Sequence, residues 1–431
     1  MGLVRTTALV VGIIIGASIF VQPSEVSRHV STIPAMFAVW SAAGIMSIAG
    51  ALVSASLARK FPKTGGVYVY LRETISPGAG FLWGWAMFWS AHSGIVAAIS
   101  MVFARYVSVL VPLSDFQTRA VAVGVILLIS TINYFGVRAG SAVQTAFTIA
   151  KLSAIAGILV AVAALAPPQA ASIPAANGPS GIREFLLAIS AGLFTFGGWH
   201  MVTYAAGETR DAAKTIPRAL FIGMIIVTVC YLSLNAAYLR VLPLETVLNS
   251  QHVAADAAGV LAGSRGASLV AILVIVSAFG GLSGTVLAGP RVYYAIAQDA
   301  VASDFRLTGF VWRAMATAHP RFQTPYVAIV AQAIWASALV ATGTYRVLFT
   351  RVVYTEFLFF GLMTVGLFRF EKRATAAGLL FLAGCAVVVG NQLAADLKEA
   401  AIGLLMVAAG IPVYYFLKRS RSDARHSYSD H

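Results

Sequence analysis

Long apolar runs recur along the whole chain, and each has about the length that a helix needs to cross the hydrocarbon core of a membrane. We count about twelve, at residues 8–25, 34–58, 81–112, 119–137, 143–165, 185–206, 218–240, 267–297, 326–343, 348–368, 375–391 and 399–417. Of the 431 residues, 59% are hydrophobic and only 11% are charged. A water-soluble domain of this length could not bury so much apolar surface. The sequence therefore predicts an all-α polytopic membrane protein with about twelve transmembrane helices.

The formal net charge of +14 is explained by the distribution of basic residues between the two sides of the membrane. With the N-terminus inside, most of the 30 Lys and Arg residues fall in loops on the inner side, as the positive-inside rule expects. The basic residues form no single long patch, which argues against a nucleic-acid partner. We therefore expect a multi-pass protein of a bacterial inner membrane with both termini in the cytoplasm.

Motifs for covalent chemistry or tight metal binding are absent from the sequence. The two cysteines, Cys230 and Cys385, both fall inside apolar runs, so a disulfide framework is not expected. The phosphate-binding pattern G-x-x-x-x-G-K-[ST], the zinc pattern H-E-x-x-H and Cys/His clusters do not occur. The sequence predicts no cofactor and no metal, and neither an enzyme nor an ATP-driven pump.

Two of the apolar runs are interrupted by weak helix formers at mid-depth. The first contains "LVVGIIIGASIFVQPSEV" at residues 9–26, and the sixth contains "LFTFGGWHMVTY" at residues 193–204. Five spans separate the two positions, and an odd number inverts the second set relative to the first. Paired broken helices in corresponding halves are typical of secondary transporters with inverted repeats. We predict repeats at 1–165 and 183–370, joined by a Pro-rich linker at 166–182, with two further helices and a short tail at 371–431.

A broken helix exposes backbone groups that lipid cannot satisfy, so a bound solute can serve as their partner. The N–H groups at a half-helix start favour an anion, and the C=O groups at a half-helix end favour a cation. A zwitterion that carries a carboxylate and an ammonium on one carbon satisfies both. The alternative is a plain glycine kink that serves helix packing.

Several stretches together resemble the amino acid–polyamine–organocation (APC) transporter superfamily, and within it the L-type amino acid transporter branch. They are "GIIIGASIFVQP", "ARKFPKTGGVYVYLRETISPGAGFLWGW" at 58–85, "FTFGGWHMVTYAAGETRDAAKTIPRAL", "AGPRVYYAIAQD" at 288–299, "HPRFQTP" at 319–325 and "GIPVYYFLKR" at 410–419. The resemblance implies a leucine-transporter-like fold, a 5+5 inverted repeat with helices 1 and 6 broken. The first break departs from the family, because it reads Gly16-Ala17-Ser18 where Gly-Ser-Gly is usual.

The resemblance also assigns roles to residues at the two breaks. The N–H groups of Gly16, Ala17 and Ser18 would bind the substrate carboxylate. Carbonyls near Ile14 and Ile15, and those along Phe194, Thr195, Phe196 and Gly197, would bind its ammonium. Phe194 would cap the pocket from outside and Trp199 would help to gate it, the alternative for both being ordinary apolar packing. Glu208 would belong to an inner gate or else to a solvated loop. His200 is interpreted as a structural hydrogen-bonding residue, and the alternative is a group that titrates near neutral pH.

Lys151 and Glu356 are ionisable residues inside predicted spans. A lysine at mid-bilayer costs about 2.5–3.5 kcal/mol on insertion scales, unless its side chain snorkels to the surface. By resemblance, Lys151 replaces a sodium ion and bonds carbonyls at the first break together with a hydroxyl on the eighth helix, for which Ser283 is the candidate. Glu356 is either a coupling residue or the partner of Arg351 or Arg346 at the interface.

These features together predict a sodium-independent exchanger or uniporter of small to medium neutral L-amino acids that works by alternating access. The alternatives are a proton-coupled symporter and a membrane amino-acid sensor that does not transport. Residues 113–118, "LSDFQT", contain no cysteine, so we expect no disulfide-linked subunit and a monomer in the lipid bilayer.

Overall fold

The computed structural model describes residues 1–63, 65–136, 141–166, 181–302 and 310–416. Within these ranges the regular structure is helical throughout, with no strand. The prediction of an all-α polytopic protein is confirmed. The proposed linker falls almost wholly outside the described residues, and the division into two repeats stays a prediction.

Ten helical segments of the described chain are long and apolar enough to cross a membrane. They are α3 (Ile33–Lys60), the continuous unit of α5 (Pro77–Ala86), η2 (Met87–Ala91) and α6 (His92–Leu110), α7 (Asp115–Tyr134), α8 (Ser141–Leu165), α9 (Ile182–Phe196) with η3 (Trp199–Glu208), α10 (Ala212–Val241), α12 (Val253–Ala302), α15 (Tyr345–Glu371), α16 (Ala376–Ala395) and α17 (Leu397–Ala408) with the residues up to Phe416. Two shorter apolar helices are α1 (Leu3–Ile14) and α14 (Tyr326–Thr342). Each of the twelve predicted runs therefore corresponds to one helical segment.

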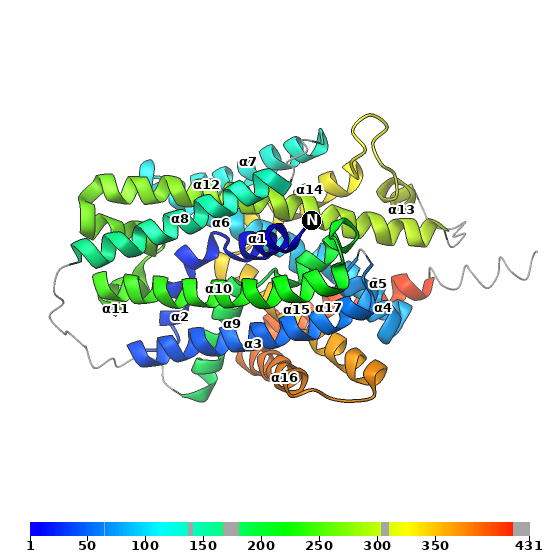
Figure 1. Cartoon of the computed structure of the whole chain (residues 1–431). Helices are drawn as coiled ribbons and strands as arrows, with labels where there is room; N and C mark the ends of the chain where they lie inside the picture. Colours follow the sequence, from blue (N-terminus) through cyan, green and yellow to red (C-terminus); the bar gives the residue numbers. More distant parts are fainter. Residues whose placement is uncertain (64, 137–140, 167–180, 303–309, 417–431) are drawn as a thin grey trace, which may run out of the picture.

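The long helices lie side by side along one axis of the molecule, with α1 among them (Figure 1). We call the end of the bundle toward α13 (Phe310–Met315) the proximal end, and the end toward α11 (Leu244–Asn249) and α2 (Gln22–Ser27) the distal end (Figure 1). Short helices join the long ones: η1 (Ser18–Phe20) and α2 (Gln22–Ser27) follow α1, and α4 (Val67–Thr74), α11 (Leu244–Asn249) and α13 (Phe310–Met315) lie in connections. Helix α1 packs against α10, α8 and η3, whereas α7, α8, α16 and α17 expose many apolar side chains to the surrounding lipid.

Polar residues in the connections fix where several long helices begin. Thr32, Ser76, Ser114, Thr344 and Thr375 each accept a hydrogen bond from the backbone N–H three residues later. Such caps satisfy one of the N–H groups that an α-helix start leaves without a partner. In α3 and α5 a proline follows within the first turn, where its missing N–H costs nothing.

The two predicted breaks are present. Helix α1 ends at Ile14, and Ile15 (φ −70°, ψ 76°) turns the chain before the short η1. Helix α9 ends at Phe196, and Gly198 adopts a left-handed conformation (φ 94°) before η3 begins. A side chain at Gly198 would be strained, and its Cβ would lie 2.9 Å from Cγ2 of Ile13. The glycine therefore permits both the turn and the close approach of the two broken helices.

Helix α12 begins earlier than the run at 267–297 predicts. Its first part starts at Val253, and non-helical residues Ala262 and Gly263 (φ 62°) separate that part from the spanning part. The segment before the kink is too short to span a membrane, so hydropathy alone did not reveal it.

Candidate functional site

The broken parts of α1 and α9 meet in the interior of the bundle. The hydroxyl of Tyr231, from α10, lies 2.9 Å from the carbonyl oxygen of Ile14 and 3.0 Å from that of Thr195. Tyr231 is fully buried and packs against Phe196, with 4.9 Å between the ring centroids. One side chain thus links the last turns of the two half-helices.

The break in α1 leaves backbone N–H groups without acceptors. The Gly16 N–H donates to the Ile14 carbonyl at 2.6 Å, but in the described part of the chain the N–H groups of Ala17 and Ser18 donate no hydrogen bond. Both residues are buried, and a helix start gives such N–H groups a partial positive charge. Of the three N–H groups expected to bind a carboxylate, two are available for an anion.

The carbonyl groups at the breaks are partly occupied. The Ile14 and Thr195 oxygens accept from the Tyr231 hydroxyl, and the Ile14 oxygen also accepts from the Gly16 N–H. The Ile15 oxygen accepts from Lys151, and the Phe194 oxygen accepts from the Gly197 N–H. No donor to the Phe196 oxygen is present among the described residues. A carbonyl oxygen has two lone pairs, so the occupied groups can still accept a further bond. Free N–H groups and partly free carbonyls close together form a suitable site for a zwitterion.

Lys151 on α8 connects the break to a neighbouring helix. The residue is 6% exposed, and its Nζ donates to the carbonyl oxygens of Gly12 at 3.3 Å and Ile15 at 3.2 Å. Helix α12 approaches at Gly281, where a Cβ would lie 3.9 Å from Nζ. No hydrogen bond joins Lys151 to the half-buried Ser283 in the described structure, so the role of Ser283 stays a prediction. The ammonium lies where a bound cation would otherwise contact the same carbonyls.

The two aromatic residues expected to gate the pocket have different surroundings. Phe194 contacts Tyr345 and Phe349 of α15, with centroid distances of 6.2 and 5.5 Å, on the distal side of the break. Trp199 lies between Phe360 and Phe381, at 4.9 and 6.0 Å, in a packed environment of the kind that the alternative interpretation describes. Their roles in gating stay predictions, and the Glu208 side chain lies outside the described residues.

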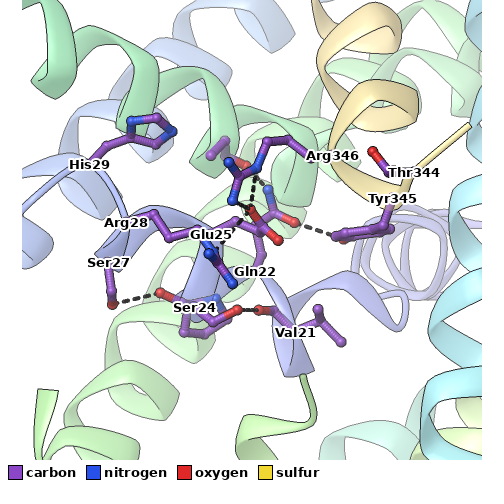
Figure 2. A network of polar contacts seen from close by, with 12 residues as sticks. Val21, Gln22, Ser24, Glu25, Ser27, Arg28, His29, Thr344, Tyr345 and Arg346 are labelled. Carbon is purple, nitrogen blue, oxygen red and sulfur yellow. Dashed lines mark hydrogen bonds and ion pairs between the residues drawn. The ribbon is translucent and has the colours of Figure 1, made fainter. Parts of the chain in front are cut away.

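A polar network at the distal end ties α2 to α9 and α15 (Figure 2). Gln22 donates to the Ala191 carbonyl at 2.8 Å and accepts from the Tyr345 hydroxyl at 2.7 Å. Glu25, whose side chain is 7% exposed, lies 2.9 Å from Arg346 and 3.7 Å from Arg28. These contacts join the half-helix after the α1 break to α9 and α15.

Exchanging the charges of Glu25 and Arg346 tests whether this ion pair between α2 and α15 contributes to transport. We expect Glu25→Arg or Arg346→Glu alone to lower transport about five- to tenfold, because each places like charges together beside the Glu25 position, which is only 7% exposed. The double variant restores the opposite charges and should recover much of the rate. Initial uptake rates of the four proteins in reconstituted vesicles measure the coupling. Strictly additive effects would show that the pair does not act as a unit.

The structure excludes one of the two alternatives for Glu356, and the expectation for His200 is wrong. Glu356 is paired neither with Arg351, which binds Glu399 at 2.6 Å, nor with Arg346, which binds Glu25. His200 is not a structural hydrogen-bonding residue, since neither ring nitrogen has a hydrogen-bond partner in the described part of the chain. The orientation of α15 about its own axis directs Arg346 toward α2 and Arg351 toward α17, and it leaves Glu356 buried in the interior of the bundle.

Sequence reasoning missed Tyr231 and Gln22. Both are polar groups within or beside apolar stretches, and this is the only signal that the sequence offers for them. Within the described residues, no group of three or more His, Cys, Asp and Glu side chains is arranged to hold a metal ion.

Comparison with known proteins agrees with this architecture. Residues 1–409 match the family model described as "Amino acid permease". The chain is 30% identical to the serine/threonine exchanger SteT of Bacillus subtilis (strain 168), covering 98% of this chain and 97% of the relative. It is 29% identical to the human large neutral amino acids transporter small subunit 2, over 96% of this chain and 79% of the relative. It is also 30% identical to the human b(0,+)-type amino acid transporter 1, over 86% and 76%.

The family match spans nearly the whole chain, and it includes both broken helices. The relatives named above are transporters, and their alignments cover most of each protein. The chain belongs to the amino acid permease family of the APC superfamily, in a branch similar to the L-type amino acid transporters.

Proposed function

We propose that this protein exchanges small to medium neutral L-amino acids across the membrane by alternating access, without sodium. The observation that carries the proposal is the meeting of two broken helices, where the buried N–H groups of Ala17 and Ser18 and the Phe196 carbonyl lack protein partners among the described residues. These groups match the carboxylate and the ammonium of an amino acid. The names of two relatives, a serine/threonine exchanger and a large neutral amino acid transporter, support the same substrate class.

Sodium independence is supported by Lys151. Its ammonium already contacts the Gly12 and Ile15 carbonyls, and a sodium ion there would have to displace a charged donor. The preference for smaller substrates is supported by Ser18, since its side chain occupies a position where the family usually has glycine. Neutral substrates are favoured because the first and sixth broken segments carry no acidic residue at mid-depth.

The same reasoning supports a topology. We assign the proximal end to the cytoplasm and the distal network to the outer face of a bacterial inner membrane, since basic residues gather at the proximal end. We also propose a monomer without a disulfide-linked partner. The human relative is named a small subunit, whereas here the cysteines are a half-buried Cys230 within α10 and a buried Cys385 within α16.

Exchange in proteoliposomes tests the proposed function. Vesicles are loaded with single unlabelled amino acids, a labelled mixture is added outside without sodium, and empty vesicles serve as the control. We expect uptake that requires an internal neutral amino acid and does not change when sodium is added. The amino acids that support uptake identify the substrates.

Other outcomes would replace the proposal. Uptake into empty vesicles that rises with an inward proton gradient would identify a proton-coupled symporter. Binding of an amino acid without uptake under any gradient would identify a sensor. Uptake that requires sodium would contradict the role assigned to Lys151.

A further inference from the structure

Glu356 and His200 form an isolated pair of titratable side chains in the interior of the bundle. Glu356 lies on α15 and His200 on η3, and the two residues are 3% and 0% exposed. The Glu356 Oε1 and the His200 Nε2 are 4.0 Å apart. Neither that oxygen nor either ring nitrogen has a hydrogen-bond partner in the described structure. The two side chains therefore lie within ion-pair distance of each other without a hydrogen bond between them.

The surroundings of the pair are mainly aromatic. The His200 ring contacts Phe360 at 5.1 Å, Trp199 at 5.7 Å, and Trp83 and Tyr204 at 5.8 Å. These rings surround the imidazole and present no charge that could balance a carboxylate. A largely buried carboxylate without a cation beside it is strongly unfavourable inside a membrane protein.

Other titratable groups face the pair without pairing with it. His92 on α6 is within electrostatic range of His200, but its Nε2 donates to the Thr285 carbonyl at 2.8 Å. Tyr204 on η3 is within electrostatic range of Glu356, and Tyr70 of α4 and Tyr293 of α12 are within range of Tyr204. Cys385 of α16 lies against α15 at Gly361.

Two basic residues of α15 itself have other partners, since Arg346 is paired with Glu25 and Arg351 with Glu399. The neighbouring groups therefore supply no compensating positive charge.

We propose that Glu356 and His200 form a proton-binding site that holds one proton across the junction between η3 and α15. With one proton bound, the pair exists either as a carboxylic acid beside a neutral imidazole or as a carboxylate beside an imidazolium. Both forms are neutral overall and can close to an O–H···N or N–H···O hydrogen bond. Removal of the proton leaves a net negative charge that the aromatic surroundings cannot stabilise.

The position of the site couples proton binding to movement. Segment η3 follows the Gly197–Gly198 turn of the broken helix, and His200 and Trp199 contact α15 through Phe360. Movement of η3 away from α15 separates the pair and admits water to it. The protonated pair thus favours η3 against α15, whereas the deprotonated pair favours separation. A transport cycle that must pass through both arrangements slows when the proton is lost.

A pH profile of exchange tests this site and rests on the proposed function. In wild type, with equal pH inside and outside, we expect the rate to fall above a transition by about tenfold per pH unit, as for any rate that requires one bound proton. Glu356→Gln keeps the shape and stays neutral, so its rate should be independent of pH. Asp115→Asn, at an exposed carboxylate, should keep the wild-type profile. His200→Asn should move the transition because it replaces the partner of the carboxyl group.

An infrared measurement tests the site without transport. The purified protein should show the C=O stretch of a protonated carboxyl group at neutral pH, or lose an imidazolium band on alkaline titration while the carboxylate band remains. The signal should disappear in Glu356→Gln and shift in Glu356→Asp, which also serves if the glutamine variant does not fold. A wild-type signal that persists in both variants, or a pH-independent wild-type rate, overturns the proton site. Loss of exchange with the infrared signal intact would overturn only the proposed function.

Discussion

Replacing Lys151 with alanine is expected to abolish most amino acid exchange, lowering the rate by on the order of 100-fold or more. A hydrogen bond to a charged group contributes about 1.5–3 kcal/mol, and two such bonds hold the Gly12 and Ile15 carbonyls. A loss of about 2.8 kcal/mol already corresponds to a factor of 100. Without the ammonium, the end of α1 loses its link to α8 at the point where the substrate would bind. Initial exchange rates at matched amounts of reconstituted protein measure the effect.

Two controls separate the position of the charge from general damage. Lys63→Ala removes an exposed lysine near the proximal end and should leave the rate unchanged. Lys151→Met keeps the length of the side chain without its charge and should be as inactive as Lys151→Ala, while both elute as folded proteins. Partial rescue of Lys151→Ala by sodium would support the replacement of an ion by the lysine. A wild-type rate in either Lys151 variant would contradict the role given to this residue.

Replacing Tyr231 with phenylalanine is expected to lower exchange about five- to tenfold, with the ring packing intact. The hydroxyl lies between the Ile14 and Thr195 carbonyls, and its loss leaves at least one buried acceptor without a donor. Such a group costs about 1–3 kcal/mol, and 1.4 kcal/mol is a factor of ten. The apparent affinity for substrate should also change, because both carbonyls belong to the proposed site.

Tyr238 provides a matched control on the same helix. It is equally buried, but its hydroxyl has no hydrogen-bond partner in the described structure. Tyr238→Phe removes the same atom from α10 and should leave the rate of exchange unchanged. Equal losses in the two variants would show that the effect comes from α10 packing and not from the link between the half-helices.

The elements that sequence reasoning predicted are those that local properties decide. Apolar length alone places the twelve helical segments, and glycine-rich stretches place the breaks at Ile15–Ala17 and Gly197–Gly198. The Val253–Leu261 segment escaped detection because it is neither long enough for a span nor rich in turn residues. Local sequence is therefore sufficient for the number and position of the spans.

Polar partners were predicted less well, because they depend on how each helix is rotated about its axis. Arg346 was a candidate partner for Glu356 on its own helix, yet it binds Glu25, which is 321 residues away along the chain. The Tyr231 hydroxyl finds carbonyls on α1 and α9 that no spacing in the sequence relates to α10. The direction of each side chain is set by the packing of the bundle, and a single sequence does not report it.

The ten residues of η3 are wound as a 3₁₀-helix, which is long for this conformation. A 3₁₀-helix rises about 2.0 Å per residue and an α-helix about 1.5 Å, so this segment is about 5 Å longer than the same residues in α-helical form. Its first residue follows the Gly198 turn, and just beyond its last residue the Arg210 N–H is bonded to the Met1 carbonyl at 2.8 Å. If η3 were to adopt the α-helical conformation, the segment would shorten by about the rise of one helical turn, and the bonded Met1 end of the chain would move with it. A change of winding within η3 would therefore alter the length of this segment by a fixed amount without a hinge outside it.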